Sequence, residues 1–374
     1  MGIEVFMERE KGFEPSTFCL EGRRSTPELL PHKLLNQLNM ASYRCLEILR
    51  YQKIIINIRE LIMTEIQTIL GPIDSNRLGV TLSHEHVLVD YSNDIYHYPW
   101  LFDMDQTKQK LIVELREAKA GGVDSIIDLS TPDLGRNIPF VKSVASEVEV
   151  NIVVATGIWR DVPRSFWSRT PDEIADIFTR EIEVGISDTG VKAGVIKVAN
   201  DMGGVTPEAE LVLRGASRAA IRTGTPISTH HWALEEVGRQ QIAVFQDENV
   251  PMNQICIGHS ADTEDINYLE DLLKEGVYLS MDRYPATNSS SNPWQKRNIT
   301  VKSLIDRGWA DKLMLGHDYA PRAILAGDTY VKKEETRYLF LNSIGIPALI
   351  TDGVSQKIID TMQKDVPRRF LAVE

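Results

Sequence analysis

Two histidines, His84 and His86, stand at the end of a short apolar run in the segment Gly79–His86, which reads Gly-Val-Thr-Leu-Ser-His-Glu-His. The residues around Val80 and Leu82 predict a buried strand. Side chains two residues apart in a strand project from the same face, so both imidazoles are expected to point the same way. Neutral imidazoles that converge on one point suit a divalent metal ion. Taken alone, the pair is more typical of hydrogen-bonded core histidines than of a metal site.

From Met63 onward, short apolar runs alternate with segments of helical periodicity. After the run around Leu82, the predicted strands are Ser125–Ser130, Ile152–Thr156, Gly194–Val198, Pro226–Thr229, Gln254–Ile257, Val277–Met281 and Leu313–Leu315. Alternation of strands and helices predicts a parallel sheet, and eight units in roughly 300 residues predict a closed (β/α)8 TIM barrel, an α/β fold. A doubly wound open sheet would need a glycine-rich phosphate turn after the first strand, and Ser83-His-Glu-His is not one.

Residues 1–62 differ from the rest of the chain, because prolines and charges are scattered there without a sustained period. We interpret the segment Gly12–Pro31 as a translated transfer-RNA gene joined upstream by a misplaced start, so the working protein is expected to begin at Met63. The alternative is a genuine tail or an oligomerisation arm. The chain is therefore divided into an extension, 1–62, that is expected to be disordered or poorly packed, and a barrel domain, 63–374. A short β-ribbon over Ile66–Ile73 is expected to cap the bottom of the barrel.

Composition excludes several classes of function. The 374 residues are 43% hydrophobic and 25% charged, which is typical of a globular protein. The net charge is −12 and no basic stripe is present, which argues against nucleic-acid binding. No apolar run is long enough to span a membrane, and no secretory signal is recognised at the start. Three widely separated cysteines predict no disulfide framework and a reducing compartment, the cytoplasm.

Side chains suited to metal binding occur at the carboxyl ends of the predicted strands, where barrels of this kind carry their chemistry. These positions hold His84, His86, Lys197, His230, His259 and Asp318. The intervals between the last four correspond to one, one and two strand–helix units. Four of the eight histidines in the chain fall at this end. Two divalent cations explain the set, with His84, His86 and Asp318 on one ion and His230 and His259 on the other.

Lys197 lies in an apolar strand, where an unpaired ammonium is costly to bury. Burial lowers the pKa of a lysine, and the neutral amine can add carbon dioxide to form a carbamate. Such an anion can bridge two cations about 3.5–4 Å apart. The alternative is a salt bridge from Lys197 to a neighbouring carboxylate. A hydroxide shared by the two cations would be the nucleophile, and Asp318 is placed to carry its proton away.

Asp262 follows His259 and is a candidate to pass that proton outward as a further catalytic residue. The sequence Asp262-Thr-Glu-Asp is also good chemistry for a helix start, so Asp262 is alternatively the N-cap of a predicted helix over Thr263–Glu275. The two roles are compatible.

Five segments, kept in order and spacing between Gly71 and Leu371, resemble one known family: Leu78–His86, Gly194–Ala199, Thr229–His230, Cys256–Thr263 and Gly316–Tyr319. They are similar to the phosphotriesterase family of the amidohydrolase superfamily. The resemblance implies a binuclear centre of zinc type, with Co²⁺, Mn²⁺ or Fe²⁺ as alternatives, and a carboxylated Lys197. It also implies a homodimer and a small neutral ester substrate, either a lactone or an organophosphate triester.

Three residues are expected to contact the substrate and to distinguish these two ester classes. Arg283, in Met281-Asp-Arg-Tyr, and Tyr319, in His317-Asp-Tyr, resemble the lactonase branch. For Arg283 the alternative is a surface cation paired with a loop acid. Trp159 resembles the triesterases, since lactonases place there a tyrosine that reaches toward the bridging hydroxide. The short polar loop Pro285–Asn298 again resembles lactonases.

The leading hypothesis is therefore a lactonase-type metal hydrolase with slow phosphotriesterase activity. The alternative within the class is a dedicated phosphotriesterase, an aryldialkylphosphatase. A hypothesis from another class is a catalytically inactive barrel that serves as a binding or scaffold protein. Metal content separates the last from the first two, and parallel assays with lactones and triesters separate the first two from each other.

Overall fold

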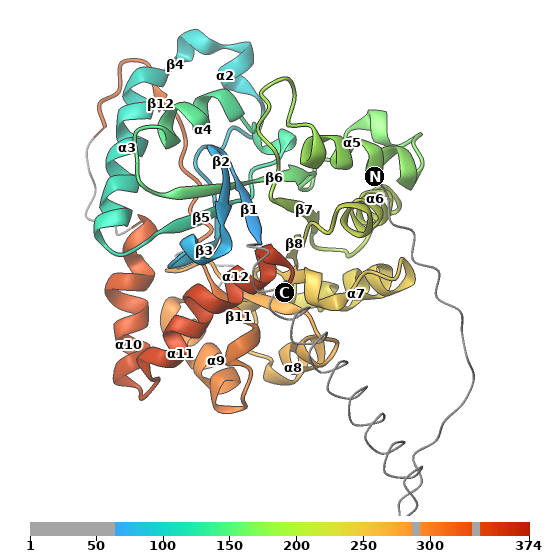
Figure 1. The fold of residues 1–374 in the computed structure, drawn as a ribbon, viewed down its shortest axis with the longest axis vertical. Coiled ribbons are helices and arrows are strands. Elements are labelled where there is room, and N and C mark those ends of the chain that lie inside the picture. The colour runs from blue at the N-terminus through green and yellow to red at the C-terminus, as the bar shows by residue number, and fades with distance from the viewer. Residues whose placement is uncertain (1–63, 286–291, 331–336) are drawn as a thin grey trace, which may run out of the picture. The chain divides into compact units, whose positions relative to one another are not determined.

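Eight parallel strands form the centre of the fold and confirm the predicted barrel (Figure 1). The computed structural model describes residues 64–285, 292–330 and 337–374, so the predicted extension and part of the predicted loop Pro285–Asn298 lie outside the described residues. The barrel strands are β3 (Thr81–Glu85), β5 (Ser125–Asp128), β6 (Asn151–Gly157), β7 (Val195–Asn200), β8 (Ile227–His231), β9 (Ile255–Ile257), β10 (Tyr278–Met281) and β11 (Leu313–Leu315).

Neighbouring strands follow chain order from β3 to β11, and all of these pairings are parallel. The first and last strands meet through backbone hydrogen bonds at their carboxyl ends. Asp318 N donates to His84 O over 2.8 Å, and His86 N donates to Tyr319 O over 3.0 Å. The contacts that close the barrel therefore run through residues predicted to belong to the site.

Helices surround the strands (Figure 1). They are α3 (Met104–Ala120), α4 (Ile138–Ala145), α5 (Pro171–Glu183), α6 (Pro207–Thr223), α7 (Val237–Asp247), α8 (Ile266–Lys274), α9 (Trp294–Asp306), α10 (Ile346–Thr351), α11 (Gln356–Asp360) and α12 (Val366–Ala372). Helices α5 and α6 each have a threonine N-cap followed by proline in the first turn, which fixes where they start.

The predicted β-ribbon is confirmed, with β1 (Glu65–Thr68) antiparallel to β2 (Gly71–Asp74). Ile69 N, in the turn between them, donates to Ile152 O at the amino end of β6 over 2.8 Å. Ile66 belongs to a buried apolar cluster that also contains Val195 and Met314 from the barrel strands and Phe370 from α12. The lower part of the barrel is thus a packed core, which leaves the carboxyl end for chemistry.

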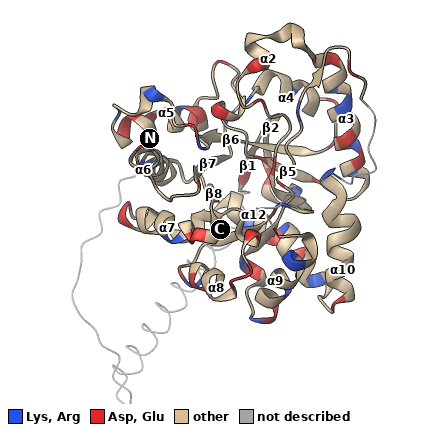
Figure 2. Cartoon of the chain, turned by 180° about the vertical axis from the view of Figure 1, so that it is seen from behind, with Lys and Arg blue, Asp and Glu red and all other residues tan. Residues whose placement is uncertain are grey.

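Charged residues of both signs are interspersed over the outer helices (Figure 2). None of the helices in the described ranges has both the length and the apolar character needed to cross a membrane. Cys256 is a buried free thiol in β9, whereas Cys19 and Cys45 lie outside the described residues.

Gly157 marks a close approach of two strand backbones beside the site. It ends β6 with φ +111°, and a Cβ atom placed there would lie 1.9 Å from Lys197 O. A glycine is therefore required where β6 pairs with the strand that carries Lys197.

We expect Gly157→Ala to lower the free energy of unfolding by about 3 kcal/mol or more, because a methyl group and a backbone oxygen would overlap. Gly224→Ala is the matched control, since Gly224 also has a positive φ, +73°, but no atom lies within 4 Å of an added Cβ. It should cost about 1 kcal/mol. Urea unfolding measures both, and equal losses would contradict the steric explanation.

Candidate metal centre

The structure brings the six predicted side chains together around one cavity at the carboxyl ends of the strands. His84 lies in β3, Lys197 in β7 and His230 in β8, whereas His86, His259 and Asp318 lie in the loops that follow β3, β9 and β11. The cavity has a volume of about 150 Å³. Apolar side chains of Val89, Leu134, Trp159 and Ala320 complete its wall, together with Tyr91 and Arg283.

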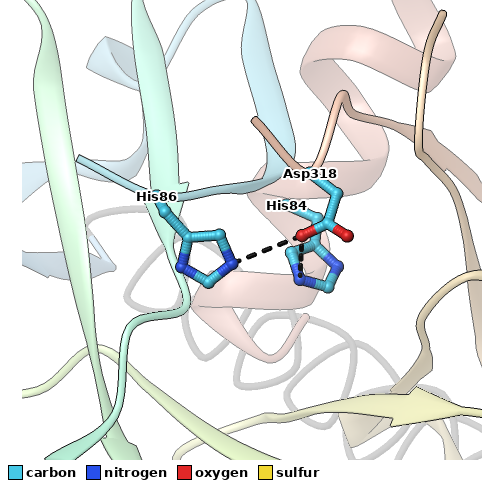
Figure 3. A group of neighbouring side chains, drawn as sticks. All are labelled: His84, His86 and Asp318. Carbon is cyan, nitrogen blue, oxygen red and sulfur yellow. Dashed lines mark ion pairs between the residues drawn. The ribbon is translucent and has the colours of Figure 1, made fainter. Parts of the chain in front are cut away.

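Asp318 points between His84 and His86 (Figure 3). Its Oδ1 atom lies 3.3 Å from His86 Nε2 and 3.5 Å from His84 Nε2. Potential ligand atoms of these three residues lie within 4.8 Å of one another. One carboxylate and two imidazoles at this spacing fit a single divalent cation.

The two other histidines continue the same cluster. The His259 ring is stacked on His84 with centroids 4.6 Å apart, and the His230 ring meets His259 edge-on at 4.5 Å. Burial lowers the pKa of His230 to about 4 and lowers that of His84 and His259 as well. Neutral imidazoles carry the lone pair that a metal requires. The buried Nε2 atom of His230 has no hydrogen-bond partner and lies 3.7 Å from Asp201 Oδ1. His259 and His230 therefore extend the cluster of His84, His86 and Asp318 by further neutral imidazoles.

Lys197 is buried among these ligands, with its Nζ atom 3.3 Å from His84 Nε2. Burial lowers the pKa of Lys197 to about 8, although the charges of Asp318 and Asp282 act in the opposite direction. In the described part of the chain no salt bridge to a carboxylate is formed by Lys197, so the structure does not support that alternative. Burial thus favours the neutral amine of Lys197 more than it would be favoured in an exposed lysine.

Asp282, directly after β10, orients two of the histidines and was missed as a site residue. Its buried carboxylate accepts hydrogen bonds of 2.8 Å from the Nδ1 atoms of both His84 and His259. Burial alone would raise the pKa of Asp282, but the positive charge that either ring carries when protonated, and the hydrogen bonds from both rings, hold it well below its usual range. With Nδ1–H fixed on the carboxylate, each Nε2 lone pair is available to a metal. The position of Asp282 at the carboxyl end of a predicted strand was the feature of the sequence that could have identified it as a site residue.

Glu85 positions the loop that carries Asp318. Glu85 is the last residue of β3, between His84 and His86 in the sequence, and its fully buried side chain projects from the face of the strand opposite to His84. Its carboxylate accepts hydrogen bonds from His317 N over 2.7 Å, from His317 Nδ1 over 2.9 Å and from Tyr319 N over 3.1 Å. These bonds hold the backbone on both sides of Asp318, so Glu85 is a second positioning residue that sequence reasoning missed.

Three residues at this end of the barrel have left-handed backbone conformations. The φ values are +63° for His259, +64° for Arg283 and +54° for Asp318. Non-glycine residues rarely adopt this region, since each costs about 1–3 kcal/mol, and the conformation persists only where the surroundings hold it in place. The hydrogen bonds to Asp282 and Glu85 supply that constraint, since His259 N donates to Asp282 Oδ2 over 3.2 Å.

Arg283 links Asp318 to Asp262. Its Nε atom donates to Asp318 Oδ2 over 3.0 Å, and its Nη1 atom donates to Asp262. The other oxygen of Asp262 accepts from the fully buried Arg297 over 2.6 Å. Arg283 thus lines the cavity and is paired with two acids, whereas its contact with a substrate stays a prediction.

The predicted N-cap role of Asp262 needs correction. It is not the N-cap of α8, because that helix begins at Ile266 and is capped by Asp265, whose carboxylate accepts from Asn267 N and Tyr268 N. The predicted passage of a proton outward through Asp262 stays a prediction. The guanidinium of Arg283, which lies between Asp318 and Asp262, does not release its proton in proteins, so such a path needs another group or a water beside it.

The two aromatic residues predicted to contact substrate have different positions. Trp159 lines the cavity, and its Nε1 atom lies 3.5 Å from His230 Nδ1. Tyr319 does not point into the cavity. Its hydroxyl donates to Glu114 Oε2 over 3.2 Å and its ring packs against Tyr338 with centroids 4.9 Å apart. The predicted substrate contact of Tyr319 is therefore corrected to a structural contact behind the loop.

Comparison with known proteins places this site in a family. The model of the phosphotriesterase family matches residues 64–371. The phosphotriesterase homology protein of Mycobacterium tuberculosis is 41% identical over 324 residues, with 82% of this chain and 98% of that protein covered. The aryldialkylphosphatase of Saccharolobus solfataricus is 35% identical, with 80% and 97% covered. The structure of the phosphotriesterase from Mycobacterium tuberculosis gives a TM-score of 0.76 at 40% identity, with coverage of 82% and 98%.

We expect Asp282→Asn to weaken metal affinity about 10- to 100-fold, because one of the two accepting oxygens becomes an NH2 group that only donates, so one histidine must change tautomer or lose its bond. Zinc titration in competition with a chelator measures the change. Asp265→Asn is the matched control, since asparagine also caps helices well and Asp265 is not in the cavity. Equal affinities for the two variants would contradict the role assigned to Asp282.

Glu85→Gln should lower the free energy of unfolding by about 1–3 kcal/mol, because a buried N–H of the 317–319 backbone loses its acceptor. It should also weaken metal binding through Asp318. The test is a double-mutant cycle with Asp318→Asn. If Glu85 acts through Asp318, the loss of metal affinity caused by Glu85→Gln largely disappears in the Asp318→Asn background, whereas full additivity would refute it.

Proposed function

This chain belongs to the phosphotriesterase family, whose members are hydrolases, and on that premise we propose that it is a lactonase-type metal hydrolase. It opens the ester bond of a small neutral lactone and cleaves organophosphate triesters more slowly. The observation that carries the proposal is the convergence of His84, His86, Lys197, His230, His259 and Asp318 on one small cavity.

The proposed cofactors are two divalent cations, most simply Zn²⁺, with Co²⁺, Mn²⁺ or Fe²⁺ as alternatives. His84, His86 and Asp318 would hold one, and His230 and His259 would hold the other. When bound, the pair lowers the pKa of water and polarises a carbonyl or phosphoryl oxygen. Lys197 would be carboxylated: its neutral Nζ forms a bond to the carbon of CO₂ and loses a proton. Its low pKa and burial among the histidines support this step.

Asp318 is the proposed proton acceptor. Burial would raise its pKa, but His84, His259 and Arg283 hold that pKa well below the usual range, so the carboxylate is ionised at neutral pH. Arg283 donates to Oδ2, which leaves Oδ1 facing the two histidines in the cavity. This oxygen is the one available to receive a proton from an attacking water.

The cavity wall fits an uncharged substrate. Val89, Leu134 and Trp159 present apolar surface, so the body of an ester can displace water without leaving polar groups unpaired. Arg283 offers the cavity a donor next to Asp318, which suits an ester oxygen. This pairing of an apolar wall with one guanidinium supports the lactone as the preferred substrate.

A dedicated phosphotriesterase is the second candidate, and Trp159 is the observation that favours it. The indole supplies a flat wall at the position where the lactonase branch is expected to have tyrosine, and the aryldialkylphosphatase relative supports the same reading. A binding or scaffold protein is the candidate from another class. A homodimer is proposed from the family resemblance alone.

The deciding experiment compares kcat/KM for lactones and for neutral phosphotriesters with the protein loaded with zinc in the presence of bicarbonate. We expect about two equivalents of metal and a preference for lactones. A preference for triesters by orders of magnitude would favour the second candidate. Absence of bound metal and of both activities would favour a scaffold.

Lys197→Ala should bind less than two equivalents of metal and lose at least about 100-fold in kcat/KM, because the bridging anion is removed. Lys192→Ala is the matched control, since Lys192 is exposed just before the same strand. Metal analysis and kinetics read out both variants. Full metal content and full activity in Lys197→Ala would contradict a bridging role for this residue.

A further inference from the structure

The indole of Trp159, which forms part of the wall of the metal cavity, is in contact with three other side chains. The Tyr91 ring is tilted against it with centroids 6.0 Å apart, and the His230 ring meets it edge-on at 5.9 Å. The guanidinium of the next residue, Arg160, lies over the indole, 4.3 Å from the ring centroid. A cation over an aromatic face is attracted by the ring, so Arg160 stabilises this orientation of Trp159.

Asp201, in the loop after β7, holds Arg160 in this place. The Nη1 atom of Arg160 donates to Asp201 Oδ2, and Oδ1 of the same carboxylate accepts from Met202 N over 2.9 Å. The side chain of Arg160 is 46% exposed, whereas that of Asp201 is 24% exposed. An arginine this exposed would otherwise sample many rotamers in water. The ion pair therefore selects the conformer of Arg160 that covers the indole.

Asp133, in the loop after β5, holds the backbone of the same segment. Its carboxylate accepts from Trp159 N over 3.0 Å and from Asp161 N over 3.1 Å, and Thr131 Oγ1 donates to it over 2.6 Å. Strand β6, which precedes Trp159, pairs with β5 on one side and with β7 on the other. Residues 159–161 are thus held from the loops of both neighbouring strands, with the backbone bound to Asp133 and the Arg160 side chain bound to Asp201.

The orientation of the indole affects the size of the cavity. The cavity measures about 150 Å³, which is below the roughly 300–1,000 Å³ that is usual for pockets that bind small molecules. Trp159 is the largest side chain in its wall, and the indole Nε1 atom lies 3.5 Å from His230 Nδ1. An indole turned away from His230 would therefore widen the cavity on the side of this metal-ligand candidate.

We propose that Asp133, Arg160 and Asp201 are positioning residues that hold the Trp159 indole in one orientation and thereby set the upper size of the ester group beside it. The preferred substrate is then a compact monocyclic ester, and the indole excludes a second ring fused to it. The limit on substrate size rests on the proposed function, whereas the orientation of Trp159 does not.

The orientation of Trp159 is tested without turnover, on protein labelled with 5-fluorotryptophan. The chain has six tryptophans, and Trp159→Phe identifies the fluorine resonance of Trp159. In the natural sequence this resonance should be a single line without relaxation dispersion. In Arg160→Gln it should split or show relaxation dispersion, because the indole then exchanges between rotamers. A single line that stays free of dispersion in Arg160→Gln would overturn the proposal.

Arg164→Gln is the matched control, since Arg164 also lies over an indole, that of Trp167, with 5.9 Å between the guanidinium and the ring centroid. Trp167 is 53% exposed and is not part of the cavity wall. This variant should therefore leave the Trp159 resonance as a single line.

The two carboxylates are tested in the same way. Asp133→Asn removes one of the two acceptor oxygens used by the 159–161 backbone, and Asp201→Asn removes the charge that holds Arg160. Each variant should also produce exchange in the Trp159 resonance. A variant that leaves this resonance unchanged would overturn the role assigned to its carboxylate.

Substrate size is tested on the zinc-loaded protein with two lactones that share a six-membered ring, δ-valerolactone and the bicyclic dihydrocoumarin. Arg160→Gln should raise the ratio of kcat/KM for dihydrocoumarin over δ-valerolactone by at least about fivefold relative to the natural protein, chiefly through a lower KM for dihydrocoumarin. Arg164→Gln should leave the ratio within about twofold.

The two readouts separate this inference from the proposed function. If the natural protein hydrolyses neither lactone but the Trp159 resonance responds as expected, the proposed function fails and the positioning roles are retained. If lactones are hydrolysed and the ratio in Arg160→Gln stays within about twofold of the natural protein, the limit on substrate size is overturned.

Discussion

The buried carboxylate of Asp282 is the interaction on which the geometry of the site depends. It joins the first and sixth barrel strands by accepting from His84 and His259, and Arg297 donates to its backbone oxygen over 2.7 Å. A carboxylate without such partners is expensive to bury. The two rings and the carboxylate therefore stabilise one another, because the hydrogen bonds compensate the cost of burying the charge of Asp282. The same hydrogen bonds leave the Nε2 atoms of His84 and His259 facing the cavity.

The backbone contributes a second constraint. Strand ends on this side of the barrel turn through left-handed residues, and buried carboxylates hold them in place. Glu85 holds the backbone around Asp318 in this way. It lies in the first barrel strand, β3, whereas Asp318 follows the last barrel strand, β11. The stability of the fold and the position of the ligands are thus supplied by the same hydrogen bonds, which is consistent with strain concentrated at a functional site.

Much of this arrangement could be predicted from the sequence. Apolar alternation placed eight strands, and the rule that ligands stand at carboxyl ends selected His84, His86, Lys197, His230, His259 and Asp318. These predictions depend on the periodicity of the strands and on the order of strands and helices, and short stretches of the sequence are enough to recognise both. The ribbon over Ile66–Ile73 is local in the same way.

The predictions that failed depend on information that spacing does not carry. Tyr319 directly follows Asp318 in the sequence, yet its hydroxyl donates to Glu114, a residue of α3 far away in the sequence. Asp262 and Asp265 look alike as helix starts, and two distant arginines decide that Asp262 is used elsewhere. Asp282 and Glu85 act on partners far away in the sequence, so no local pattern predicts their roles.

The most direct test of the proposed two-metal site is anomalous diffraction at the zinc edge from crystals of the zinc-loaded protein. Two peaks are predicted, one at coordination distance from His84, His86 and Asp318 and one from His230 and His259, with density for a carboxylate on Lys197 Nζ between them. A single peak, or two peaks with Lys197 unmodified and turned away, would contradict it.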